Sequence, residues 1–151
     1  MNKSTEIAKA LKTVSNFIGH NQLICIGEGL RGEEKSFFVE KLISIEKTIE
    51  EMPKTYETDG QGDKAIATLH YFKGGKDWYI VEKDMGCQTD TIQDKQHQAY
   101  GLANIGMGFS QGYISIQELI ENNVELDMYF TPCTIGEIKK SKERITNAEI
   151  N

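Results

Sequence analysis

The sequence predicts an α+β fold in which N-terminal helices pack on a mainly antiparallel sheet, with short helices between the later strands. Up to residue 52, apolar residues recur every three or four positions, which is typical of amphipathic helices. From residue 65 onward, short apolar or alternating segments are separated by glycine-rich and polar turns, which is typical of strands. The 151 residues predict a single domain, helical over 1–56 and sheet-forming with short helices over 64–145.

Two helices are predicted in the N-terminal part. The first covers residues 6–18, with Ser4 or Thr5 available as its cap. The second carries one apolar stripe and ends at Pro53, and its stripe consists of Phe38, Leu42, Ile45, Ile49 and Met52. The short apolar segment 21–26 between them is predicted to be a strand or a buried loop.

The central part predicts an antiparallel meander. Residues 65–72 and 77–84 read as two strands joined by a glycine turn at Gly74 and Gly75. Residues 85–95 are predicted to be a polar loop and residues 96–105 a third strand. A glycine-rich connection at 106–112 then leads to a brief strand at Tyr113 and Ile114.

Two short helices are predicted in the C-terminal part from capping signals. Ser115 and Glu118 have the spacing of a capping box, which predicts a helix to Asn122. Residues 125–130 read as a further strand, and Pro132 suits the first turn of the next helix. Thr134 and Glu137 repeat the capping spacing before a final helix to Ile145.

Composition and charge narrow the function classes. The formal net charge is −6, which does not match the basic surface of a general nucleic-acid binder. A local basic cluster near the C-terminus consists of Lys139, Lys140, Lys142 and Arg144. The three cysteines, Cys25, Cys87 and Cys133, are far apart, which favours a reducing compartment. No apolar run is long enough for a membrane span, and we expect a cytoplasmic protein.

The segment Gly27-Glu28-Gly29-Leu30-Arg31-Gly32 matches the glycine pattern of a dinucleotide-binding loop. Glu28, Glu33 and Glu34 argue against that interpretation because they would repel a pyrophosphate. The antiparallel order of the later strands also argues against it, since such loops belong to parallel sheets. The sequence therefore favours a flexible turn at 27–32 and leaves nucleotide binding as an alternative.

No other motif predicts a metal, a cofactor or a catalytic centre. The three histidines have no cysteine or histidine at ligand spacing, and no serine or cysteine has the context of a known nucleophile. We interpret His70, in the middle of a predicted strand, as structural. Glu82 and Asp84 share one face of a predicted strand, where a solvated pair is favoured over a catalytic pair.

Aromatic residues concentrate on the predicted strands and suggest a contact surface. Three interpretations stay open: core packing, which is favoured, a protein-binding patch, and a stacking platform for single-stranded nucleic acid. The acidic charge weakens the third interpretation. The candidate interaction residues are Trp78, Tyr79, Glu82, Tyr100, Tyr113 and Tyr129.

Four segments between Leu69 and Ile138 follow one another in a characteristic order. They are Trp78–Glu82, Ala99–Ala103, Gly112–Leu119 and Leu126–Pro132. Their order and spacing resemble a domain of unknown function found in small accessory proteins of plasmids, phages and integrated elements. The resemblance covers a little under half of the chain, and it departs at Tyr100, where the family often has phenylalanine. It implies a bacterial mobile-element context and no catalytic residue.

These observations favour a non-enzymatic accessory protein of a phage or plasmid that binds another protein. A more specific hypothesis is that it modulates a host defence or nucleic-acid-processing system, for example by occupying the basic groove of a nuclease. The first alternative is a nucleotide-binding enzyme that uses Gly27–Gly32. The second is a nucleic-acid-binding module that uses the basic cluster at 139–144, although direct nucleic-acid binding is not favoured. The sequence predicts no cofactor and does not identify the partner.

Overall fold

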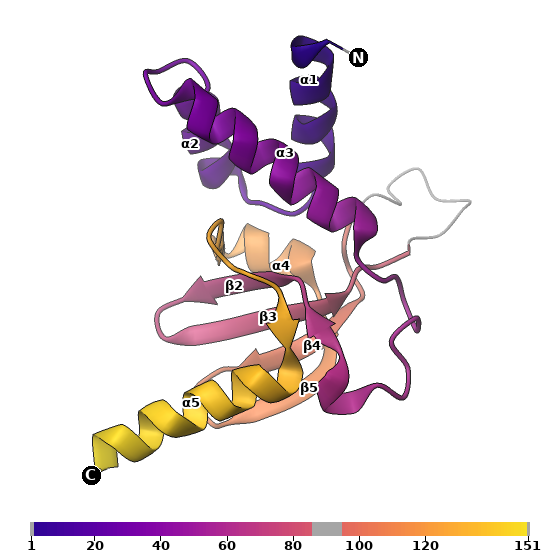
Figure 1. The fold of residues 1–151 in the computed structure, drawn as a ribbon, viewed down its shortest axis with the longest axis vertical. Helices are drawn as coiled ribbons and strands as arrows, with labels where there is room; N and C mark the ends of the chain where they lie inside the picture. Colours follow the sequence, from indigo (N-terminus) through magenta and orange to yellow (C-terminus); the bar gives the residue numbers. More distant parts are fainter. Residues whose placement is uncertain (1, 86–94, 151) are drawn as a thin grey trace.

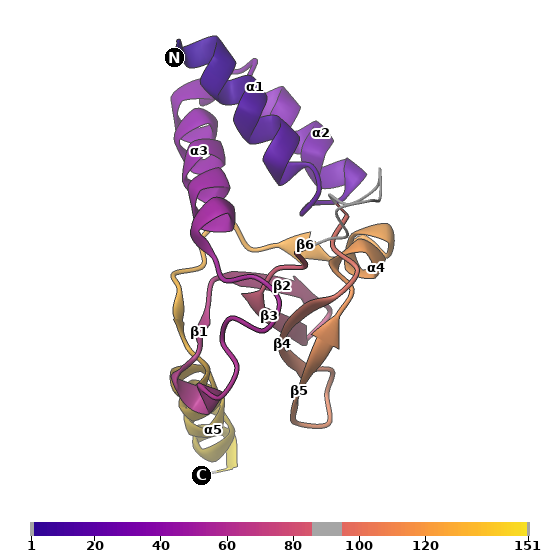
Figure 2. The ribbon, with the colours of Figure 1, turned by 90° about the vertical axis from the view of Figure 1, so that its right-hand side faces the viewer.

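The computed structural model describes residues 2–85 and 95–150, and it confirms the predicted α+β fold (Figure 1). Three helices form one layer: α1 (Lys3–Val14), α2 (His20–Gly29) and α3 (Lys35–Glu51). They pack on one face of a five-stranded antiparallel sheet with the order β5-β4-β3-β2-β6. The C-terminal helix α5 (Ile135–Ile150) packs on the opposite face (Figure 2).

The helical layer differs from the prediction at its first two elements. The side chain of Asn2, and not Ser4 or Thr5, caps α1 by accepting a hydrogen bond from the N–H of Thr5 at 2.8 Å. The prediction of a strand or loop at 21–26 is wrong, because this segment belongs to α2. Ile26 is buried while Ile24 and Cys25 are exposed, so the segment buries one side of a helix.

Helix α3 confirms the predicted second helix and its end at Pro53. Val39, Leu42 and Ile49 are buried on its inner face, in keeping with the apolar stripe. Helix α1 lies along α3, and Lys9 forms an ion pair with the buried Glu46 at 3.2 Å. The main apolar cluster is shared between these helices and the sheet, so the two predicted parts of the chain have a common core.

The sheet begins with the hairpin of β2 (Leu69–Lys73) and β3 (Lys76–Glu82). Its turn at Gly74 and Gly75 has positive φ at both residues, which glycine adopts without strain. The predicted strand 65–72 is divided, because β1 (Ile66–Ala67) pairs with β7 (Cys133–Thr134) in a separate small sheet. Every second residue from Ala67 to Tyr71 is nevertheless buried, as is typical of a strand.

The remaining strands are β4 (Ala99–Asn104), β5 (Phe109–Ile114) and β6 (Glu125–Leu126). The prediction of a connection at 106–112 is partly wrong, because residues 109–112 already belong to β5 and pair with β4. The strand predicted at 125–130 is also too long. The chain leaves β6 in a turn where the carboxylate of Asp127 accepts a hydrogen bond from the N–H of Tyr129 at 2.9 Å.

Both predicted capping signals of the C-terminal part are present. Ser115 caps α4 (Ile116–Glu121) by accepting a hydrogen bond from the N–H of Glu118 at 3.1 Å. The Thr134 hydroxyl does the same for Glu137 at the start of α5, also at 3.1 Å. Pro132 precedes α5 and is not in its first turn.

Of the polar loop predicted at 85–95, residues 86–94 lie outside the described residues. Among the described helices, none is long and apolar enough to cross a membrane.

Candidate functional site

A β-bulge in β3 places two consecutive side chains on the α5 side of the sheet. Ile80 pairs with Gly101, but Glu82 pairs with the preceding residue, Tyr100, so the pairing shifts by one residue at Val81. Both Val81 and Glu82 therefore line the same hollow. A Cβ atom at position 101 would lie 1.9 Å from the carbonyl oxygen of Tyr79, so β4 fits against the bulge only with glycine there.

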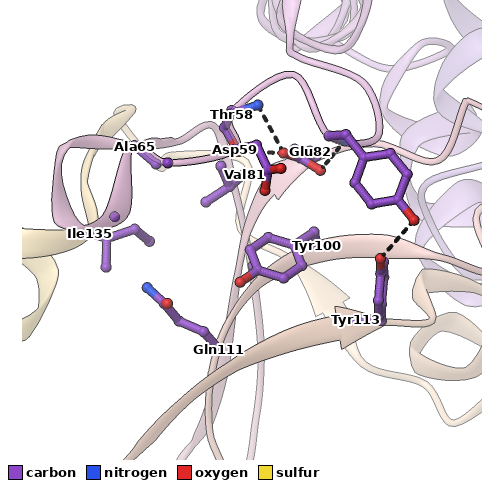
Figure 3. Close-up of a pocket in the computed structure, with 13 residues that line it drawn as sticks. Thr58, Asp59, Ala65, Val81, Glu82, Tyr100, Gln111, Tyr113 and Ile135 are labelled. Carbon is purple, nitrogen blue, oxygen red and sulfur yellow. Dashed lines mark hydrogen bonds between the residues drawn. The ribbon is translucent and has the colours of Figure 1, made fainter.

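Glu82 holds the loop that follows α3 over the bulge (Figure 3). Its carboxylate accepts hydrogen bonds from the N–H of Tyr56 at 2.8 Å and from the N–H of Thr58 at 3.0 Å. The Thr58 hydroxyl donates a third hydrogen bond to the same carboxylate. The Glu82 residue is only 4% exposed, and these charge-assisted bonds offset the cost of burying it. Tyr56 has a φ of 69°, a strained conformation that the bond to Glu82 helps to maintain.

Lys83 fastens the beginning of the same loop. Its N–H donates to the carbonyl of Pro53 at 2.9 Å, and its ammonium donates to the carbonyl of Ile49 at 2.7 Å. The second bond satisfies a free carbonyl at the C-terminal end of α3. Burial, followed by the nearby charge of Lys54, lowers the pKa of Lys83. Lys83 and the last residue of β3, Glu82, thus fix where the loop starts and how it turns.

The loop and the sheet enclose a hollow of about 130 Å³. Its walls come from residues 56–65, from β3, β4 and β5, and from Ile135 at the start of α5. The rings of Tyr100 and Tyr113 meet edge to face with centroids 5.8 Å apart. The Tyr113 hydroxyl donates to the Tyr56 hydroxyl at 3.2 Å, so three tyrosines surround one side of the hollow.

The hollow carries negative charge. Asp59 and Glu82 line it, and among its described lining residues there is no Lys, Arg or His. The pKa of Tyr113 is raised, chiefly by its hydrogen bond to Tyr56 and then by desolvation, with Glu82 and Asp59 adding to the effect. The site therefore disfavours a further negative charge and suits a cation.

Strand β5 forms both a wall of the hollow and one edge of the sheet. Gln111 and Tyr113 contribute to the wall. On its other side, within the described residues, β5 has no backbone hydrogen bond to any segment, so half of its N–H and C=O groups face outward. The side chains of Ile105 and Met107, at the tip of the β4–β5 hairpin, are exposed, Met107 at 96%.

The β4–β5 hairpin carries no formal charge. Residues 96–117 contain no Asp, Glu, Lys or Arg, although these four residue types make up 26% of the whole chain. Edge strands in natural proteins are commonly protected from pairing by charged residues, above all lysine. Within the described part of the chain, the edge of β5 has no such protection.

The structure brings together three of the six interaction residues predicted from the sequence. Glu82, Tyr100 and Tyr113 line the hollow. Trp78 packs against the main core on the opposite face of the sheet, and Tyr79 is buried beneath α5. Tyr129 lies elsewhere, and the residue is 72% exposed. Its ring stacks on Phe37 with centroids 6.3 Å apart and lies under the Lys41 ammonium at 4.8 Å.

Sequence reasoning missed Tyr56, Asp59 and Gln111, which also line the hollow. Tyr56 and Asp59 lie in a loop, and no local pattern indicates that this loop folds over the sheet. The interpretation of Glu82 and Asp84 as a solvated pair is wrong for Glu82, which is buried. The Asp84 carboxylate instead accepts hydrogen bonds from the N–H groups of His97 and Gln98, at 3.2 and 3.0 Å.

His70 connects three segments of the fold. Its two ring nitrogens lie 3.0 Å from the Asp127 carboxylate and 2.8 Å from the Asp77 carboxylate. Its ring stacks on Tyr79 with centroids 4.6 Å apart. This arrangement is that of a structural residue, in agreement with the interpretation from the sequence. Among the described residues, no group of three His, Cys, Asp or Glu side chains could hold a metal ion.

The Gly27–Gly32 motif does not have the geometry of a dinucleotide-binding loop. Gly27 and Gly29 lie in α2, and the described residues before them, 2–26, form no strand. A Cβ at Gly29 would lie 2.4 Å from the Phe38 ring, so this glycine allows α2 to pack closely against α3. Gly29 therefore has a packing role, and the flexible turn expected at 27–32 is wrong for Gly27 and Gly29, which are helical. The C-terminal end of α2 also has the wrong dipole for a phosphate.

Part of the basic cluster on α5 forms ion pairs. The ammonium of Lys139 lies 2.9 Å from the Asp63 carboxylate, and that of Lys142 lies 3.4 Å from the Asp77 carboxylate. These pairs fix α5 to the sheet side of the molecule and reduce its free positive charge. The side chain of Arg144 lies outside the described part of the chain.

Comparison of the chain with family models, with curated proteins and with solved structures finds no match.

Proposed function

We propose that this protein is a non-enzymatic binding protein that accepts an extended segment of a partner protein at the edge of β5. The observation that carries the proposal is the six-residue edge strand β5, which no described segment pairs with on its outer side. The sequence around it, residues 96–117, is free of formal charge. Adding a strand to such an edge is a common mode of peptide recognition, in which backbone hydrogen bonds supply affinity.

The surroundings of β5 support the same function. Ile105 and Met107 add exposed apolar surface at the hairpin tip, next to the start of the strand. Exposed apolar side chains beside an open sheet edge are typical of a surface that binds another protein. The hollow provides a recess on the same edge, so side chains of the added segment have a place to be selected.

The biological setting remains the one that the sequence predicts. The resemblance to accessory proteins of phages and plasmids supports a role in modifying a bacterial partner, such as a defence or nucleic-acid-processing protein. The net charge of −6 is compatible with contact to a basic protein surface. Neither a nucleotide-dependent activity nor direct nucleic-acid binding is favoured, since Gly29 packs α2 on α3 and two of the four C-terminal cations form ion pairs.

The test places a charge on the edge and leaves the fold intact. Ser110, an exposed residue of β5, is replaced by lysine, and the matched control is Ser44→Lys on the exposed face of α3. Peptides that bind the parent protein are first selected from a displayed library of random sequences. The affinity of the selected peptides for the parent and for both variants is then measured. We expect Ser110→Lys to weaken binding by tenfold or more and the control to leave it unchanged.

Hydrogen exchange locates the contact in the same experiment. Bound peptide should slow amide exchange within residues 109–114 and leave the α1–α3 layer unaffected. If no peptide is selected, or if bound peptide protects another surface, the proposal is wrong. Protection that depends on protein concentration in the absence of peptide would instead identify a second copy as the occupant.

A further inference from the structure

The hollow opens beside β5, where the proposed partner strand would lie. Gln111 and Tyr113 belong to the strand and also line the hollow, so one face of β5 leads directly into it (Figure 3). An added strand would lie about 4.8 Å outside β5 and would point every second side chain to this face. To reach over β5 into the hollow, such a side chain has to be long.

We infer that the hollow receives the lysine or arginine side chain of the extended partner segment, and this inference rests on the proposed function. The charge of the lining supports a cation, since Asp59 and Glu82 contribute carboxylates and no basic residue is present among the described lining residues. Lysine and arginine are also the longest cationic side chains, with apolar stems that can cross β5.

The tyrosine rings supply a second attraction for the same ligand. Tyr100 and Tyr113 stand nearly perpendicular, at 79°, and form two walls of a corner beside the hollow. Tyr56 is held next to them by its hydroxyl contact with Tyr113. The faces of aromatic rings attract ammonium and guanidinium groups within about 6 Å. An anionic side chain would be repelled by the carboxylates, and a purely aliphatic one would pack on the rings without any attraction to the carboxylates.

A second copy of this chain does not offer such a side chain at its own β5. Residues 96–117 contain no Lys or Arg, so two β5 edges brought together would leave both hollows without a cation. Each copy also carries a net charge of −6, which opposes association of two copies. The occupant is therefore a partner segment with a basic residue.

The first experiment tests the hollow without any strand. Butylguanidinium chloride is titrated into the full chain at matched ionic strength, and the ring resonances of Tyr56, Tyr100 and Tyr113 are followed by NMR. We expect saturable shifts of these rings, with affinity weakened about fivefold in Asp59→Asn. Glu57→Gln, an equal change of charge in the same loop at a residue outside the hollow, is the control and should bind as the parent does. Absence of saturable shifts overturns the inference.

The second experiment separates the inference from the proposed function. Two peptides, acetyl-TVTKTVT-amide and acetyl-TVTQTVT-amide, are compared for binding and for protection of the β5 amides. Preference for the lysine peptide, lost in Asp59→Asn, supports both proposals. Equal binding with β5 protection overturns the cation site and keeps the edge-binding function. Butylguanidinium binding without β5 protection by either peptide overturns edge binding and leaves the hollow as a cation site.

Discussion

The buried carboxylate of Glu82 accepts hydrogen bonds from both the backbone N–H and the hydroxyl of Thr58, which lies 24 positions earlier in the chain. These hydrogen bonds, and not apolar packing, hold the loop in place. None of residues 54–64, all of which the structure describes, belongs to either apolar cluster. The loop that covers the hollow is therefore positioned by polar contacts, and the carboxylate of Glu82 accepts three of its hydrogen bonds.

Replacing Glu82 by glutamine should lower the free energy of unfolding by about 1–3 kcal/mol, because an amide cannot accept three hydrogen bonds as a carboxylate does. Urea denaturation measures the change, and amide exchange at Tyr56 and Thr58 should become faster. Glu57→Gln is the control, since Glu57 is exposed in the same loop. Equal stability of the two variants would show that Glu82 does not organise the loop.

The bulge gives a second prediction, at Gly101. Alanine there places a Cβ within 1.9 Å of the Tyr79 carbonyl oxygen, and backbone atoms have little freedom to move away. We expect Gly101→Ala to destabilise the protein by about 3 kcal/mol or more, or to prevent folding. Gly112, its partner on β5, is the matched control, because a Cβ there meets nothing within 4 Å.

Gly112→Ala should leave the free energy of unfolding within about 0.5 kcal/mol of the parent value. Thermal and urea unfolding of both variants, measured side by side, provide the comparison. A Gly101→Ala variant as stable as Gly112→Ala would mean that β3 and β4 do not form the bulge described above.

The sequence predicts the fold class and most elements because their signals are local. The stripe on α3, the glycine turn at 74–75 and the caps at Ser115 and Thr134 each lie within a few residues. Segment 21–26 was predicted wrongly because a short apolar run fits a strand as well as a buried helix face. Residues 109–112 are not predicted as part of β5, because glycine, as at Gly112, has low strand propensity.

The candidate site was only half predictable, because it depends on contacts distant in sequence. Glu82, Tyr100 and Tyr113 lie on strands, and their polar or aromatic side chains identify them as candidate interaction residues. The bulge that turns Glu82 toward the hollow lies between the pairs Ile80–Gly101 and Glu82–Tyr100, a register that no local pattern specifies. Tyr56 and Asp59 join the site because Glu82 holds their loop, a contact visible only after folding.

The two glycines of the 27–32 motif should respond in opposite ways to alanine. Position 27 is helical with open space around its Cβ, so Gly27→Ala should stabilise α2 by about 0.5–1 kcal/mol. At position 29 the Cβ would lie 2.4 Å from the Phe38 ring, so Gly29→Ala should destabilise the protein by about 1–3 kcal/mol.

Thermal unfolding with and without nucleotide checks this pair of variants. We expect opposite shifts of the melting temperature and no effect of ATP or NAD on the parent. A nucleotide-dependent shift that both substitutions abolish would restore the nucleotide-binding interpretation of the motif.

Tyr79 gives the protein a defined sensitivity to alkaline pH. Burial beneath α5, together with the nearby Asp77, Cys133 and Asp127, raises the pKa of its phenol to about 12, against an ordinary value of about 10. Between these two values the unfolded chain releases this proton while the folded chain retains it. The stabilising contribution is therefore complete below pH 10 and is lost as the pH rises from about 10 to 12.

Urea denaturation at several pH values between 8 and 12 measures this loss, and Tyr79→Phe isolates the contribution of the phenol. The parent should lose stability more steeply than the variant between pH 10 and 12, whereas the two curves should run parallel between pH 8 and 9. Burial also raises the pKa of Tyr71, so some alkaline loss should persist in the variant. Identical slopes for parent and variant above pH 10 would show that the Tyr79 hydroxyl is solvated and that α5 does not cover it.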